Sequence, residues 1–185
     1  MKRLALLGAV AACWLGVPSA DADASGTSFE PYLASMSWPV RASHARVINL
    51  RATIVDWIVA GDPPLLGGIP RRCASIRRME SRGRLLRIVP PPALQRSHAR
   101  LVRAYAAARA GCPRVERIAH AASAALRNGG SDLSTIQANA RKEIVHFDGT
   151  TLGPFEGALF AWRWDVLHYA VKLAVAPPAW VRELV

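Results

Sequence analysis

Residues 92–112 decide the fold class of this chain, and they read PALQRSHARLVRAYAAARAGC. The apolar side chains of this segment recur on one side of a helical wheel: Leu94, Leu101, Tyr105, Ala108 and Cys112. The opposite side carries Arg96, Arg100 and Arg103. Apolar residues at helical spacing, with charges facing away from them, are typical of an amphipathic helix that buries one face. The segment therefore predicts a helix packed against a core.

The same period recurs along the rest of the chain, and the 13 prolines and 13 glycines cluster between the apolar stretches. We expect further helices at about residues 41–60, 70–88, 115–126, 134–147 and 154–174. Pro113 either ends the helix that begins near residue 92 or kinks it, and the sequence leaves both alternatives open. Short connections favour antiparallel neighbours. The prediction is an all-α protein, a small bundle of four to five mostly antiparallel helices.

The first 24 residues, MKRLALLGAVAACWLGVPSADADA, have the pattern of a cleaved signal peptide. Lys2 and Arg3 precede an apolar run at 4–17 that is too short to span a bilayer, and small residues follow. The sequence thus predicts export to the periplasm, the cell envelope or the medium. Residues 10–13 also resemble a lipobox, in which Cys13 would be acylated and would hold the protein at a membrane.

The remainder of the chain is expected to form one domain. Residues 25–38 are polar and mixed, which predicts a flexible leader, and residues 39–185 are long enough to bury a continuous core. No transmembrane helix is expected in this part. The most apolar stretch, 157–176, contains Arg163, Asp165, His168 and Lys172, which are costly at the centre of a bilayer.

Two cysteines, Cys73 and Cys112, fall in the body of the chain. In an oxidising compartment they are expected to form a disulfide that joins two neighbouring helices, since both lie on apolar stripes. The alternative is a pair of buried free thiols that behave as small hydrophobic side chains. A zinc site is disfavoured because the local spacing of cysteines and histidines that such sites use is absent.

Motifs that carry catalysis are absent: the chain has no Gly-x-Ser-x-Gly, phosphate loop, His-Glu-x-x-His or calcium loop. We therefore expect no cofactor and no metal. Glu143 and His146 are spaced to meet one ion on a helix, but a di-iron site needs a second such pair, which is missing. His146 is better explained as a histidine that stabilises a helix C-terminus.

His98 and Arg163 are the two residues that favour a pocket. Each lies among apolar positions of its helix, so together they predict an acid/base group and an anion clamp inside an exported all-α enzyme. The alternative for His98 is a core histidine hydrogen-bonded to a backbone carbonyl. The alternative for Arg163 is an ion pair with Glu156 or Glu143.

Charge is distributed very unevenly along the chain. Residues 71–117 contain thirteen arginines, no lysine and two acidic residues, whereas the rest of the chain after the signal is balanced. Two rows are expected to form a cationic surface, with Arg71, Arg78 and Arg82 on one helix and Arg96, Arg100 and Arg103 on the next. Such a surface suits an anionic envelope polymer, lipid headgroups or an acidic protein. A merely solvated face is the alternative.

Nucleic acid is disfavoured as a partner because Tyr105 is the only aromatic residue of the basic segment and no groove-reading motif is present. The sequence thus leaves two classes of function. The first is a non-enzymatic exported domain that binds an anionic surface through residues 71–117. The second is the exported enzyme that uses His98 and Arg163.

Overall fold

The computed structural model describes residues 28–61, 63–78, 81–129 and 132–184. Within these ranges the chain is helical, with short connections and no strand, so the all-α prediction is confirmed. The predicted signal segment and Cys13 lie outside the described residues. None of the described helices is both long enough and apolar enough to cross a membrane.

Helix α1 (Phe29–Ala60) begins twelve residues before the predicted start. Residues 29–38, which we expected in a flexible leader, form its first turns and bury Phe29, Tyr32, Leu33 and Met36. A proline inside a helix costs about 3 kcal/mol, but burying a large apolar side chain stabilises by roughly 1.5–3 kcal/mol. Four such side chains outweigh Pro39, so the leader prediction is wrong for these residues. The helix ends as predicted, at left-handed Gly61 (φ 66°).

The helix expected at 70–88 is two helices, α2 (Pro63–Arg77) and α3 (Ser81–Arg87). The break rotates the apolar stripe. Leu85 is buried in α3, whereas its neighbour Leu86 is 59% exposed. A 3-10 turn, η1 (Pro92–Leu94), then leads into α4.

Helix α4 (Gln95–Asn128) is continuous through Pro113, which resolves the alternatives left open there. Its buried stripe runs from Ser97 to Ser123 and passes Pro113 without changing face, because Cys112 and Val115 are both buried. Burial on both sides of the proline holds one helix together despite the missing N–H group. The helix ends at Gly129, whose φ of 65° suits glycine.

Helices α5 (Leu133–Phe147) and α6 (Gly153–Lys172) are joined by a single π-helical stretch, η2 (Asp148–Leu152), into one rod. The sequence predicted two separate helices, because Gly149, Gly153 and Pro154 lie between them. Arg51 of α1 holds the junction, donating from Nε to Asp148 Oδ1 at 2.8 Å and from Nη1 to Glu156. A short helix, α7 (Ala179–Arg182), follows and was not predicted.

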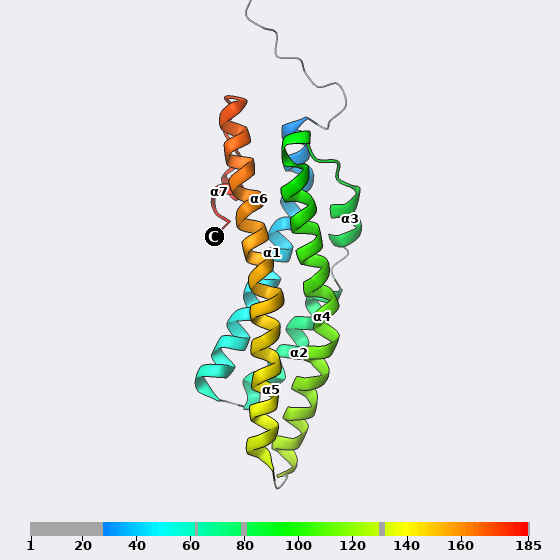
Figure 1. Cartoon of the computed structure of the whole chain (residues 1–185), viewed down its shortest axis with the longest axis vertical. Helices are drawn as coiled ribbons and strands as arrows, with labels where there is room; N and C mark the ends of the chain where they lie inside the picture. The colour runs from blue at the N-terminus through cyan, green and yellow to red at the C-terminus, as the bar shows by residue number, and fades with distance from the viewer. Residues whose placement is uncertain (1–27, 62, 79–80, 130–131, 185) are drawn as a thin grey trace, which may run out of the picture.

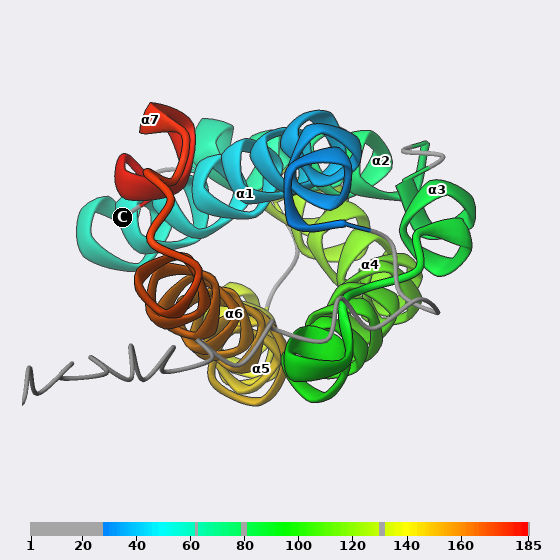
Figure 2. The ribbon, with the colours of Figure 1, turned by 90° about the horizontal axis from the view of Figure 1, so that it is seen from above.

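The described residues form more helices than the four to five predicted, because the short helices α3 and α7 are additional. The long elements pack as an elongated antiparallel bundle, as expected (Figure 1). Seen from above, α1 and α2 lie on one side of the core, while α4 and the α5–α6 rod lie on the other (Figure 2). Helix α2 packs against both α1 and α4. The largest fully buried side chains include Trp162, Tyr32, Tyr105 and Phe155, which come from α1, α4 and α6. This packing leaves the outer faces of α2 and α4 in solvent.

Candidate anion-binding surface

The outer face of α4 carries a longer arginine row than the sequence analysis recognised. All five of its arginines are exposed: Arg96, Arg100, Arg103, Arg114 and Arg117. They share one helical face, since successive members are three, four or eleven residues apart, which is close to one turn or three turns of a helix. At about 1.5 Å per residue, the row is roughly 32 Å long. The predicted row did not extend to Arg114 and Arg117, because the sequence left open whether the helix continues past Pro113. We call these five residues the α4 row.

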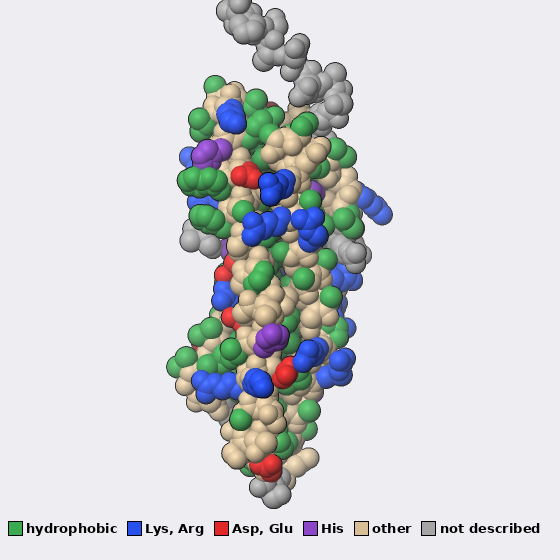
Figure 3. Space-filling view, in the orientation of Figure 1, with side chains coloured by type: hydrophobic (Ala, Val, Ile, Leu, Met, Phe, Trp, Pro, Cys, Tyr) green, Lys and Arg blue, Asp and Glu red, His purple; other side chains and the backbone are tan. Residues whose placement is uncertain are grey.

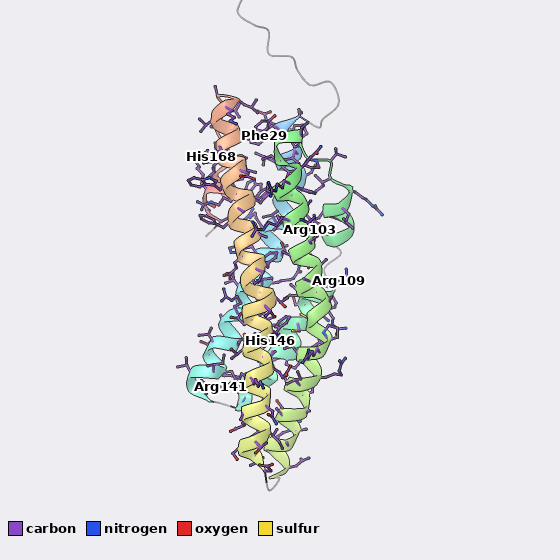
Figure 4. The ribbon with its side chains drawn as sticks, viewed as in Figure 1. Phe29, Arg103, Arg109, Arg141, His146 and His168 are labelled. Atoms are coloured by element: carbon purple, nitrogen blue, oxygen red, sulfur yellow. The ribbon has the colours of Figure 1, made fainter. Side chains whose placement is uncertain are left out.

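Helix α2 presents its own arginines to solvent. Arg71 of α2 and Arg78, the residue after its end, are exposed, as predicted. The predicted row of three on one helix is wrong, however, because α2 ends at Arg77 and Arg82 belongs to α3; the side chain of Arg82 lies outside the described residues. Because α2 and α4 are in contact and antiparallel, a shallow groove forms between them. Its volume is about 620 Å³, and it is lined by small residues and arginines: Ala74, Arg77, Arg78, Ala106, Arg109, Ala110 and Pro113. Figure 4 shows Arg103 and Arg109 on α4, with Arg103 the nearer of the two to the end of the bundle where Phe29 and His168 lie.

Acidic partners are scarce on this surface. Glu116 is the one acidic residue described within 71–117. It forms an ion pair with Arg77, whose Nη2 lies 2.8 Å from Glu116 Oε2. Arg114 pairs with Glu143 of α5. The other members of the α4 row form no ion pair within the described residues. Figure 3 views α4 and the α5–α6 rod and shows Lys and Arg side chains distributed over this face, with fewer acidic ones.

His98 lies in the core rather than in an open pocket. It is 6% exposed, and its Nε2 lies 3.2 Å from the backbone oxygen of Leu85 in α3. Because that oxygen only accepts, Nε2 carries the proton, and Tyr32 Oη donates to Nδ1 at 3.1 Å. Trp162 Nε1 donates in turn to Tyr32 Oη at 2.7 Å. Burial lowers the pKa of His98 and raises that of Tyr32. The chain of bonds therefore links four helices through neutral groups.

Arg163 does not join His98. Its Nε donates to the backbone oxygen of Val181 at 3.0 Å, and its Nη2 donates to that of Arg182 at 2.7 Å. The side chain therefore fastens α7 against α6. It pairs with neither predicted acid, because Arg51 binds Glu156 and Arg114 binds Glu143. The pocket that would have contained an acid/base group and an anion clamp is not formed by these two residues.

Glu143 and His146 do not act together as a pair of metal ligands. Glu143 binds Arg114, whereas His146 is exposed on α5. In the part of the chain that the structure describes, no group of three His, Cys, Asp or Glu side chains is placed to hold a metal ion.

Cys73 and Cys112 meet in the α2–α4 interface, as the helical stripes indicated, but the predicted disulfide is absent. Both are buried free cysteines. A hydrogen bond between the two thiols, together with burial, raises the pKa of Cys73. A disulfide needs the two sulfur atoms at about 2.05 Å, and the structure holds both cysteines as free thiols. The second alternative, a buried thiol pair, describes the structure.

In comparisons with known proteins, no family model, no curated protein and no solved structure matches this chain.

Proposed function

We propose that this protein is an exported, non-enzymatic helical domain that binds an anionic surface of the cell envelope through the outer faces of α2 and α4. The α4 row carries the proposal. Four of its five arginines, Arg96, Arg100, Arg103 and Arg117, are exposed without an acidic partner among the described residues. An extended line of guanidinium groups suits a ligand with repeated negative charges, such as phosphates on a polymer or a lipid layer.

A merely solvated basic face would account for the number of arginines but not for the lack of acids beside them. Solvated helices normally alternate charge sign along a face, because opposite charges three or four residues apart stabilise each other. On α4 the like charges repeat at this spacing instead: Arg96 precedes Arg100 by four residues, and Arg100 precedes Arg103 by three. This arrangement weakens an isolated helix slightly, and an anionic partner would offset the repulsion.

The test uses vesicles that contain an anionic phospholipid and matched vesicles of phosphatidylcholine alone. Wild-type protein is expected to sediment with the anionic vesicles at low salt and to be released at about 0.5 M salt, where screening shortens the reach of exposed charges to roughly 4–5 Å. Changing Arg96, Arg100 and Arg103 to Gln is expected to weaken binding at least tenfold.

The matched control changes three exposed arginines outside the α4 row, Arg41, Arg127 and Arg141, to Gln. Both triple variants lose the same net charge, so only a localised surface distinguishes them. Equal binding by the two variants, or equal binding of wild type to neutral and anionic vesicles, would show that the α4 row is solvated surface and not a binding site. Circular dichroism checks that helicity is unchanged.

A further inference from the structure

A second cationic groove lies on the opposite flank of α2, where α2 packs beside α1 (Figure 2). Its volume is about 370 Å³, and its lining includes Thr53 of α1 and Gly68, Arg71, Arg72 and Ser75 of α2. The two helices approach closely at its end, because a Cβ atom at Gly68 would lie only 3.2 Å from Thr53 Cγ2. The groove is therefore a gap between two helices that are held close together.

Helix α1 contributes a third guanidinium group beside this groove. Arg46 Nε donates a 3.0 Å hydrogen bond to Ser75 Oγ, so the side chain is fixed against a hydroxyl that lines the groove. Arg46 Nη1 is buried and has no hydrogen-bond partner within the described residues. An unpaired buried charged donor is costly, and bound water or an ion is a common partner of such groups in native structures.

The remaining chemistry of the groove is that of an oxyanion site. Ser75 Oγ accepts from Arg46 and keeps its own proton, which it can donate to a ligand. Arg71 and Arg72 are exposed at the same stretch of α2. In the described part of the chain no ion pair involves Arg46, Arg71 or Arg72. Two arginines thus line the groove together with Ser75, a third arginine is bonded to Ser75, and none of the three is balanced by a carboxylate among the described residues.

We propose that this groove binds a phosphate group through the Ser75 hydroxyl and the guanidinium groups of Arg71 and Arg72, which line it, with Arg46 of α1 holding Ser75 in place. Guanidinium groups bind tetrahedral oxyanions through paired, charge-assisted hydrogen bonds. The phosphate belongs either to a free small molecule or to a lipid headgroup. The site includes no residue of the α4 row, so this proposal can be tested independently of the function proposed above.

Inorganic phosphate is the first probe, titrated into the folded protein at constant ionic strength with chloride as the balancing anion. Saturable NMR shifts of the Ser75 amide and of arginine Nε–H groups are expected. Arg72→Gln and Ser75→Ala are each expected to weaken binding about tenfold, as for loss of one charge-assisted hydrogen bond. Arg100→Gln, which removes an exposed arginine of the α4 row, is the matched control and should leave the affinity unchanged.

Vesicles that contain phosphatidic acid form the second arm. If they compete with inorganic phosphate and Ser75→Ala weakens that competition, the ligand is a headgroup; if only free phosphate binds, it is a small molecule. Non-saturating shifts that chloride reproduces, or affinities unchanged in both Arg72→Gln and Ser75→Ala, would overturn the site. Arg72 is exposed, so this variant tests the site even if Ser75→Ala perturbs the α1–α2 contact. Retained phosphate binding beside a failed vesicle test of the α4 row would refute the proposed function alone.

Discussion

Replacing Gly111 with alanine is expected to destabilise the protein, although alanine is the better helix former. Gly111 lies in α4 where this helix passes α5. A Cβ atom there would overlap Cε2 of the Phe147 ring and would lie only 3.0 Å from Cδ2. Phe147 is 6% exposed, so the ring is packed and has little room to move. The glycine allows α4 to approach α5 closely.

The magnitude follows from two opposing effects. Helix propensity favours alanine over glycine by about 1 kcal/mol. Extra volume in a packed interface costs roughly 1–3 kcal/mol, because the ring must leave its preferred rotamer or the helices must separate. The expected net result is a loss of about 1 kcal/mol in the free energy of unfolding.

Gly157→Ala in α6 is the matched control. No atom lies within 4 Å of a Cβ atom built at Gly157, so this variant should gain roughly 0.5–1 kcal/mol. Urea unfolding followed by circular dichroism measures both variants, and their midpoints should move in opposite directions. Adding Phe147→Leu to Gly111→Ala should lessen the effect of the alanine, because the smaller side chain relieves the overlap. If both alanine variants stabilise equally, the close approach of α4 and α5 is not as described.

Three further outcomes are expected. Stability should fall as pH drops below about 6.5. Burial lowers the pKa of His98 in the folded protein, so below this pH the unfolded chain binds a proton that the folded chain does not. Equal urea midpoints at pH 7.5 and 5.5 would contradict this. Tyr32→Phe should lower the free energy of unfolding, measured in urea, by roughly 2–5 kcal/mol, because the buried Trp162 N–H and His98 Nδ1 both lose their hydrogen-bond partner. A loss below about 0.5 kcal/mol would show that neither hydrogen bond contributes to stability. Cys73 and Cys112 should resist alkylation in the folded protein and react on unfolding, since both are buried and the pKa of Cys73 is raised; rapid labelling of native protein would argue against the buried pair.

The candidate site was predictable where it depends on one helix. The row of Arg96, Arg100 and Arg103 follows from the 3.6-residue period, and the structure places all three in solvent. What the sequence could not supply were contacts across the bundle. Arg46 and Ser75 are 29 residues apart in the chain, and Arg163 meets a backbone segment that no pattern had marked as helical. Which arginine pairs with which acid depends on which helices are in contact, so Glu156 forms its ion pair with Arg51 rather than with Arg163.

The sequence by itself determined the helical class, the antiparallel order, the ends of α1 and α4 at glycines and the separation of arginines from the apolar stripe. These features arise from interactions within a few residues of each other, which local spacing records. Only the tertiary structure decided that α1 continues through Pro39 and α4 through Pro113, and that His98 joins Tyr32 across 66 residues. At the two prolines burial against another helix outweighed the local signal, because removing large side chains from water contributes more free energy than a proline costs. The His98–Tyr32 bond joins residues too far apart in the chain for local spacing to indicate.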